Sequence, residues 1–160
     1  MNKKFNNPSW NLYLDKVYSY AFWDNAFSKA ECDTIISWVF QRITDIVLNL
    51  NDRYFQFDIF GLNEGLQFTN YKAPSDKYQK HVDKSFNIPV RKLSLSVQLT
   101  DPKEYKGGEL YIYEDSKGTV MKKEQGTLVL FPSYTLHEVK PITKGERNSL
   151  VSWVTGKQFK

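Results

Sequence analysis

The chain of 160 residues contains only two histidines, His81 and His137. His81 stands two residues before Asp83, and side chains at this spacing on a β-strand point to the same face. Two imidazoles and one carboxylate, with open positions beside them, form the ligand set of non-haem Fe(II) in a facial triad. His81, Asp83 and His137 are therefore candidate ligands of a catalytic metal. A His-x-Asp tripeptide alone is weak evidence, since such short patterns arise often in unrelated proteins.

Arg147 follows His137 by ten residues and begins another apolar run. A guanidinium keeps its charge and binds a carboxylate through two parallel hydrogen bonds, so an inward-facing Arg147 would hold an anionic ligand beside the metal. From position alone, a surface ion pair with Glu146 is an equally good interpretation. The phenol of Tyr71 or of Tyr78 would donate to the same anion, although tyrosines at strand ends more often serve packing.

The composition is ordinary for a globular protein, with 41% hydrophobic and 25% charged residues and a net charge of +4. The lysines are dispersed, so we expect no nucleic-acid partner. No apolar run is long enough to span a membrane, and Met1 to Pro8 lacks the apolar core of a secretory signal. The single cysteine, Cys32, allows no internal disulfide. We therefore expect a cytoplasmic protein without a membrane partner.

The spacing of the apolar residues changes near residue 50. Ser28 to Glu31 fits a capping box, and helical spacing of apolar residues then predicts one helix over residues 29–48. Beyond residue 50 the period becomes two, and strands are expected at 54–60, 66–72, 78–83, 91–100, 109–113, 118–122, 127–131, 135–139 and 148–155. Many short strands joined by turns predict a sandwich or barrel, a class that includes the jelly roll.

The strand expected at 91–100 alternates most regularly. Its leucines and Val97 point one way, while Ser94, Ser96 and Gln98 point the other. These polar side chains either line a wet cavity or form the solvent face of an outer strand, and the sequence does not separate the two.

Several stretches, taken in order, resemble the Fe(II)/2-oxoglutarate-dependent dioxygenases, specifically the prolyl 4-hydroxylase-like branch often called PKHD-type hydroxylases. They are residues 65–71, 78–83, 91–99, 107–110 and 126–132, followed by His137, Arg147 and Trp153. The resemblance implies a mainly β protein of the α+β class, built as a double-stranded β-helix (jelly roll, cupin-like) with helical support. It implies a single domain over residues 1–160, with the helical support in 1–50 and the β core in 51–155.

The resemblance also implies the chemistry. His81, Asp83 and His137 would bind iron, and Arg147, with Tyr71, would hold the distal carboxylate of 2-oxoglutarate. Such dioxygenases are oxidoreductases that couple oxidative decarboxylation of 2-oxoglutarate to hydroxylation of a C–H bond, releasing succinate and CO₂. L-ascorbate often keeps the iron reduced. The substrate would be a peptide, a protein or a small molecule, with a peptidyl proline as one candidate, and the oligomeric state is not predicted.

Two other functions compete with this interpretation. The same barrel could be a non-catalytic module that binds a metal or a carboxylate, or a zinc hydrolase in which Arg147 would have no obvious task. One departure from the family also matters, because members usually carry extra sequence where residues 38–42 here join two helical segments directly. We expect one long helix or a sharp joint near Trp38, and the substrate entrance is not predicted.

Overall fold

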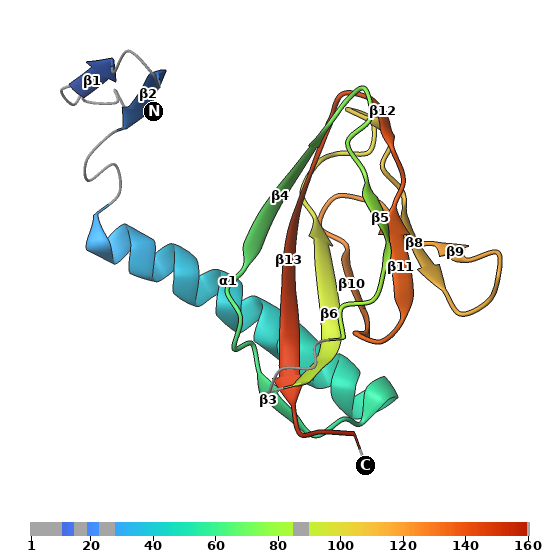
Figure 1. Cartoon of the computed structure of the whole chain (residues 1–160). Coiled ribbons are helices and arrows are strands. Elements are labelled where there is room, and N and C mark those ends of the chain that lie inside the picture. Colours follow the sequence, from blue (N-terminus) through green and yellow to red (C-terminus); the bar gives the residue numbers. More distant parts are fainter. Residues whose placement is uncertain (1–10, 15–18, 23–27, 85–89, 160) are drawn as a thin grey trace. The chain divides into compact units, whose positions relative to one another are not determined.

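The computed structural model describes residues 11–14, 19–22, 28–84 and 90–159 (Figure 1). The polar segment from Met1 to Pro8 therefore lies outside the described residues. Two compact units make up the chain, Met1–Ile43 and Thr44–Lys160. The single domain expected from the sequence stays a prediction.

The first unit contains a hairpin that the helical character of this region did not predict. Strand β1 (Asn11–Leu14) pairs antiparallel with β2 (Ser19–Phe22). Helix α1 (Lys29–Leu50) then starts in this unit and is preceded by the expected capping box. The Ser28 amide donates to Oε2 of Glu31 at 2.9 Å, and the Glu31 amide donates to Oγ of Ser28 at 3.2 Å.

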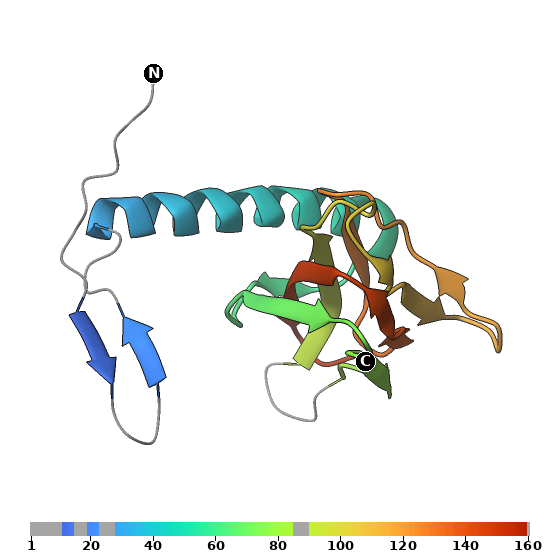
Figure 2. The same cartoon turned by 90° about the horizontal axis from the view of Figure 1, so that it is seen from above.

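Helix α1 is a single unbroken helix of 22 residues that continues through Trp38 (Figure 2). Of the two expectations for this region, the long helix is the one observed. Among the described residues, no helix combines the length and apolar character needed to cross a membrane.

The prediction of a strand over residues 54–60 is mostly wrong. A π-helical turn, η1 (Asn51–Phe55), continues directly from α1, and only β3 (Ile59–Gly61) is extended. The cause is local: the Asn51 side chain bonds both backbone groups of Phe57, at 3.0 Å and 3.1 Å, and offers them an alternative to strand pairing. Gln56 takes a left-handed conformation (φ 52°), which reverses the chain between the turn and β3.

Two facing sheets form the body of the second unit (Figure 1). The major sheet has five strands: β3, β4 (Gln67–Lys72), β6 (Val90–Gln98), β10 (Leu128–Pro132) and β13 (Glu146–Gly156). The long central strand β13 pairs with β6 along one edge and with β3 and β4 along the other. Strand β10 pairs with the other edge of β6.

The minor sheet has the order β5, β11, β8, β9. Its strands are β5 (Tyr78–His81), β11 (Leu136–Val139), β8 (Leu110–Tyr113) and β9 (Thr119–Val120). A short ribbon pairs β7 (Lys106–Gly107) with β12 (Ile142–Lys144). Most of the expected strands are therefore present, and a mainly β protein with one N-terminal helix is confirmed.

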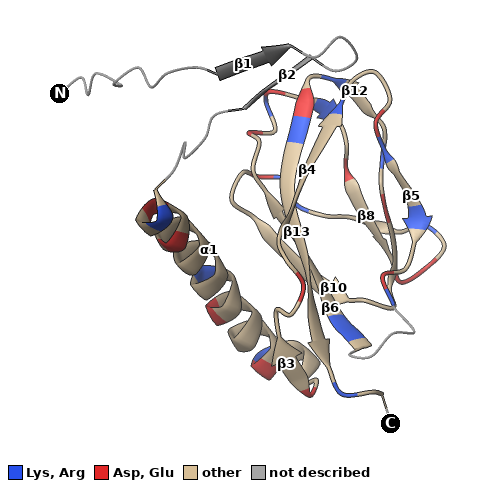
Figure 3. Ribbon diagram, turned by 60° about the vertical axis from the view of Figure 1, so that its left-hand side comes forward, with Lys and Arg blue, Asp and Glu red and all other residues tan. Residues whose placement is uncertain are grey.

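Both faces of β6 are buried. Leu93 and Leu95 are at most 1% exposed on one face, which is the burial expected of a central strand with apolar residues there. On the other face, Ser94 and Ser96 are buried and line a cavity between the sheets. The polar alternation of this strand is therefore a cavity wall and not a solvent face. Figure 3 shows both signs of charge along α1, whereas most of the strand length carries residues other than Lys, Arg, Asp and Glu.

Candidate metal centre

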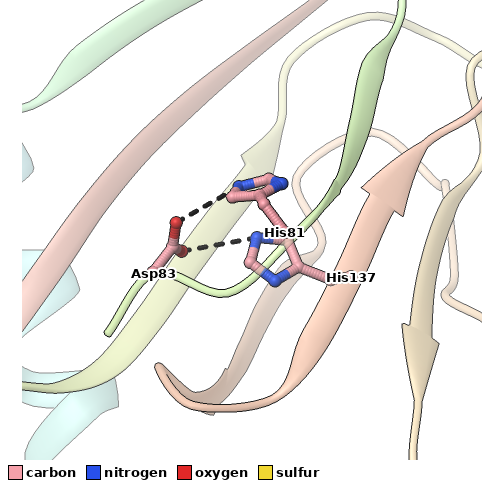
Figure 4. Close-up of side chains that lie close together, drawn as sticks. All are labelled: His81, Asp83 and His137. Atoms are coloured by element: carbon pink, nitrogen blue, oxygen red, sulfur yellow. Dashed lines mark ion pairs between the residues drawn. The ribbon is translucent and has the colours of Figure 1, made fainter. Parts of the chain in front are cut away.

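The two histidines lie opposite each other on neighbouring strands of the minor sheet. In the pairing of β11 with β5, His137 is the direct partner of His81, and their ring centroids are 4.2 Å apart. His137 therefore comes from the strand adjacent to that of His81. Asp83 follows just beyond the end of β5, where its amide donates to the carbonyl of Ser133 at 2.9 Å. The three side chains converge as Figure 4 shows.

A β-bulge in β5 brings Tyr78 to the same face as His81. Val139 pairs with Tyr78 and His137 with His81, so three steps on β5 match two on β11. In a regular strand, side chains three residues apart point to opposite faces. With the extra residue, Tyr78 and His81 both line the same cavity.

The ligand atoms of the three residues all lie within 4.8 Å of one another. Nε2 of His81 is 3.3 Å from Oδ1 of Asp83, and Nε2 of His137 is 3.4 Å from Oδ2. On the far side of each ring, Nδ1 contacts a backbone carbonyl: Gln79 at 2.7 Å for His81, and Thr135 at 2.9 Å for His137. A carbonyl oxygen only accepts, so Nδ1 of each ring carries a proton, and in the neutral tautomer the lone pair of Nε2 is directed at the carboxylate.

When both rings are neutral, the facing lone pairs and carboxylate repel unless a metal ion lies between them, whereas a protonated Nε2 donates a hydrogen bond to the carboxylate. Two imidazole nitrogens and one carboxylate oxygen match the facial ligand set of non-haem iron, and the backbone bonds to Nδ1 are those that usually orient metal-binding histidines. The donor set therefore fits a divalent transition metal.

Two buried serines support Asp83. Oγ of Ser94 donates to Oδ2 of Asp83 at 2.7 Å and lies 3.0 Å from Oγ of Ser133. Burial acts to raise the pKa of the Asp83 carboxyl, but hydrogen bonding by His137 and Ser94 outweighs it and holds that pKa well below its usual range. The indole of Trp153 also favours the charged form, although its buried N–H is outside hydrogen-bonding geometry with any described residue.

The cavity beside this cluster has a mixed lining. Apolar walls come from Leu110, Phe131, Val139 and Val151, and the ring of Phe131 meets His137 edge-on at 4.7 Å. The polar part of the lining comes from the facing strands β4, β6 and β13 and consists of Gln67, Thr69, Tyr71, Ser94, Ser96 and Ser149.

Arg147 lines the same cavity and is only 2% exposed. Its Nε and Nη2 donate to Oε1 of Gln98 at 3.1 Å and 2.7 Å, whereas Nη1 has no partner among the described residues. No described carboxylate forms a salt bridge with it, and its cross-strand partner Tyr71 places its ring 5.5 Å from Cζ. Burial lowers the pKa of the Arg147 guanidinium, and the neighbouring phenol of Tyr105 opposes this shift. A guanidinium nevertheless stays charged in proteins.

Other sequence expectations for this region can now be placed. Arg147, Ser149 and Val151 all line the cavity, as alternate residues on one face of a strand do. The surface pair with Glu146 is wrong, because Glu146 instead contacts Lys72 and Asn70. Tyr71 and Tyr78 both line the cavity, and burial raises the pKa of the Tyr71 hydroxyl while Arg147 acts to lower it.

Sequence reasoning missed some supporting residues. Ser133 follows β10 in a turn and carries no pattern that would identify it. Gln67 and Thr69 were detectable, because with Tyr71 they repeat at a spacing of two on one strand. The packing of the Arg91 guanidinium over the Trp153 ring, 3.8 Å from its centroid, joins residues too distant in sequence to be paired by inspection.

A family model described as the 2OG-Fe(II) oxygenase superfamily matches residues 66–155. The matched segment, 90 of 160 residues, begins one residue before β4 and ends one residue before the last residue of β13. It contains His81, Asp83, His137, Arg147 and Tyr71.

Two curated relatives carry the description PKHD-type hydroxylase. The one from Aliarcobacter butzleri is 35% identical over 138 residues, which covers 81% of this chain and 60% of that protein. The one from Parvibaculum lavamentivorans is 42% identical over 78 residues, covering 48% of this chain and 36% of that protein. The chain thus spans between about one third and three fifths of the length of these relatives.

Among solved structures, the chain is similar to a prolyl hydroxylase from Trichoplax adhaerens in complex with a hypoxia inducible factor oxygen degradation domain peptide fragment. The TM-score is 0.65 at 21% identity, covering 81% of this chain and 59% of that chain. At this identity the likeness shows the fold alone. It confirms the double-stranded β-helix expected from the sequence.

Proposed function

The chain belongs to the 2OG-Fe(II) oxygenase superfamily, as its resemblance to PKHD-type hydroxylases predicted, and on that premise we propose that it is an Fe(II)- and 2-oxoglutarate-dependent dioxygenase. One observation carries the proposal. A single cavity is lined both by three converging metal-ligating groups and by Arg147, a buried guanidinium without a described carboxylate partner. A cation fits the first group and a carboxylate fits the second.

In this proposal His81, Asp83 and His137 hold Fe(II). The two imidazoles are already oriented by their Nδ1 bonds, and the Asp83 carboxylate is kept ionised, so little rearrangement is needed for binding. When bound, Fe(II) and 2-oxoglutarate would supply the chemistry by which O₂ and the 2-oxo acid become succinate and CO₂ while a substrate C–H bond becomes C–OH.

Arg147 would bind the distal carboxylate of 2-oxoglutarate, with Tyr71 as a second donor. Nη1 of Arg147 has no hydrogen-bond partner among the described residues, so it can donate to a ligand. The raised pKa of Tyr71 keeps its phenol protonated at neutral pH. A charge-assisted bond of this kind is about twice as strong as one between neutral groups. The apolar walls around Phe131 would limit the access of water to the reacting groups.

We propose a peptide substrate, with a prolyl residue as the hydroxylated group. The support is indirect: the curated relatives are called hydroxylases, and the Trichoplax prolyl hydroxylase was solved with a peptide fragment. Tyr78 lines the cavity and is 52% exposed, so the site opens to solvent beside His81. A role for L-ascorbate and a cytoplasmic location are further parts of the proposal, and enzyme assays with and without ascorbate and cell fractionation would test them.

The test has two stages. Anaerobic calorimetry should first show that the purified chain binds Fe(II) and then 2-oxoglutarate. Succinate release should next be measured with O₂ over a panel of proline-containing peptides, beside a His81→Ala variant checked for folding. Absence of 2-oxoglutarate binding by the metal-loaded protein, or equal turnover by His81→Ala, would contradict the proposal. Tight binding of both ligands without turnover of any substrate would instead favour the non-catalytic module.

A further inference from the structure

A buried amide holds the guanidinium of Arg147. Both hydrogen bonds that Arg147 donates to described residues end on one atom, Oε1 of Gln98. Gln98 lies on β6, 49 residues earlier in the chain, where its direct partner on β13 is Ser149. It is 2% exposed and, unlike Arg147 and Ser149, is not part of the cavity lining. The side chain of Gln98 therefore reaches the cavity through Arg147.

The backbone of Gln98 is also fixed. Its amide donates to the Thr127 carbonyl at 2.9 Å, and its carbonyl accepts from the Gly126 amide at 2.8 Å. The side-chain amide is thus attached to a rigid strand. A long arginine side chain loses considerable rotamer freedom when it is held in one position, and that loss weakens ligand binding unless it has occurred beforehand.

The chemical type of residue 98 matters as much as its position. A carboxylate there would accept the same two bonds but would neutralise the guanidinium. An amide oxygen accepts them without adding a charge, so the cation keeps its attraction for an anionic ligand. Two of the five N–H donors of Arg147 are used by Gln98, and three remain for a ligand.

We propose that Gln98 is a positioning residue that sets the affinity for the distal carboxylate of the 2-oxo acid through Arg147. This inference rests on the proposed function and adds a residue to it. Gln98 accepts hydrogen bonds from Nε and Nη2 of Arg147 and so keeps the guanidinium in one orientation. Because the amide is neutral, it leaves the positive charge of Arg147 uncompensated.

The experiment compares two ligands that differ only at the distal end. 2-Oxoglutarate carries a carboxylate there, and 2-oxopentanoate carries a methyl group on the same five-carbon chain. Their dissociation constants are measured by calorimetry on the Fe(II)-loaded protein without O₂. The proteins are the unsubstituted chain, Gln98→Met, Gln98→Glu, and the control Gln125→Met, which alters an exposed glutamine bonded to the Leu99 carbonyl.

In Gln98→Met the Kd for 2-oxoglutarate should rise about tenfold, the ratio that corresponds to a hydrogen bond to a charged group. The Kd for 2-oxopentanoate should not change, because that ligand has no group for Arg147. Gln98→Glu should keep the melting temperature and still lose at least tenfold for 2-oxoglutarate, since it keeps the bonds and cancels the charge. The control should match the unsubstituted chain.

A packing role alone predicts a different result. Gln98→Met would then weaken both ligands equally or neither, and Gln98→Glu would bind 2-oxoglutarate normally; either pattern overturns the inference. If Gln98→Met does not fold, Gln98→Glu decides alone. Binding of neither ligand by the metal-loaded unsubstituted chain would refute the proposed function and this inference with it. A normal preference for 2-oxoglutarate in both variants would refute the inference only.

Discussion

The metal cluster and the Arg147 region line one cavity but have opposite electrostatic needs. In the cluster, the ligand atoms of His81, Asp83 and His137 lie within 4.8 Å of one another, an arrangement that suits a cation. Around Arg147, a buried positive charge is held by the neutral acceptor Gln98 and pairs with no described carboxylate, an arrangement that suits an anion. Because an uncompensated charge is costly to bury, each region favours a ligand of the opposite charge. The comparison teaches that one cavity can distinguish two ligands by the charge of the groups that face each of them.

The two regions also differ in how they are built. The cluster depends on local features: one strand pairing, and backbone carbonyls two residues before each histidine. Arg147 depends on a contact between β13 and β6 that spans 49 residues. Substitutions should therefore separate metal affinity from 2-oxo acid affinity.

The largest effect is expected for Asp83→Ala. Removing the carboxylate leaves two neutral imidazoles, so Fe(II) affinity should fall by at least about a hundredfold and succinate release should stop. Calorimetric metal titration and circular dichroism would measure binding and folding, with the exposed Asp52→Ala as the matched control. Undiminished Fe(II) affinity in Asp83→Ala would contradict the assignment of the cluster as the metal site.

Arg147→Met should come next. Loss of the guanidinium should weaken 2-oxoglutarate binding on the order of a hundredfold, as truncation of one member of a buried ion pair does. Fe(II) affinity should be unchanged, and the melting temperature should hold or rise because an unpaired buried charge is removed. Arg53→Met, at an exposed position, is the control. A parallel loss of metal affinity would show that the two regions are not separable.

Ser94→Ala should have a smaller effect, confined to the metal. The Ser94 hydroxyl bonds Oδ2 of Asp83, and loss of such a support typically weakens metal binding about ten- to a hundredfold. The Kd for 2-oxoglutarate at saturating Fe(II) should stay the same. The exposed Ser116→Ala controls for loss of a hydroxyl. Equal metal affinity in both variants would contradict a supporting role for Ser94.

Glu138→Gln should have the smallest effect and involve neither region. Hydrogen bonds from Lys140 and Tyr113 lower the pKa of Glu138 from 4.5. A lowered folded-state pKa adds stability above the unfolded pKa, and this is lost as pH falls through the folded value. Denaturant unfolding at about pH 6 and about pH 3 should therefore show a pH-dependent difference from the variant of less than about 1 kcal/mol. Altered metal affinity would be unexpected.

The sequence predicted those parts of the molecule that depend on short-range periodicity. The spacing of His81 and Asp83, the capping box at Ser28 and the inward face of β13 all follow from rules that relate near neighbours. The π-helical turn was not predictable in this way, because the Asn51 side chain competes for backbone groups that the alternation assigns to a strand. Pairing of Gln98 with Arg147 needs the register of β6 against β13, which one sequence does not contain.

The bulge in β5 determines which side chains of that strand face the cavity. Because three residues of β5 span two of β11, Tyr78 and His81 share a face that an evenly spaced ladder would deny them. Removing one residue between them would place them two apart on a regular strand, where both side chains would still face the cavity. Loss of the bulge without a change in length would instead turn one of the two side chains away from the cavity, so the length of this segment and its bulge must change together.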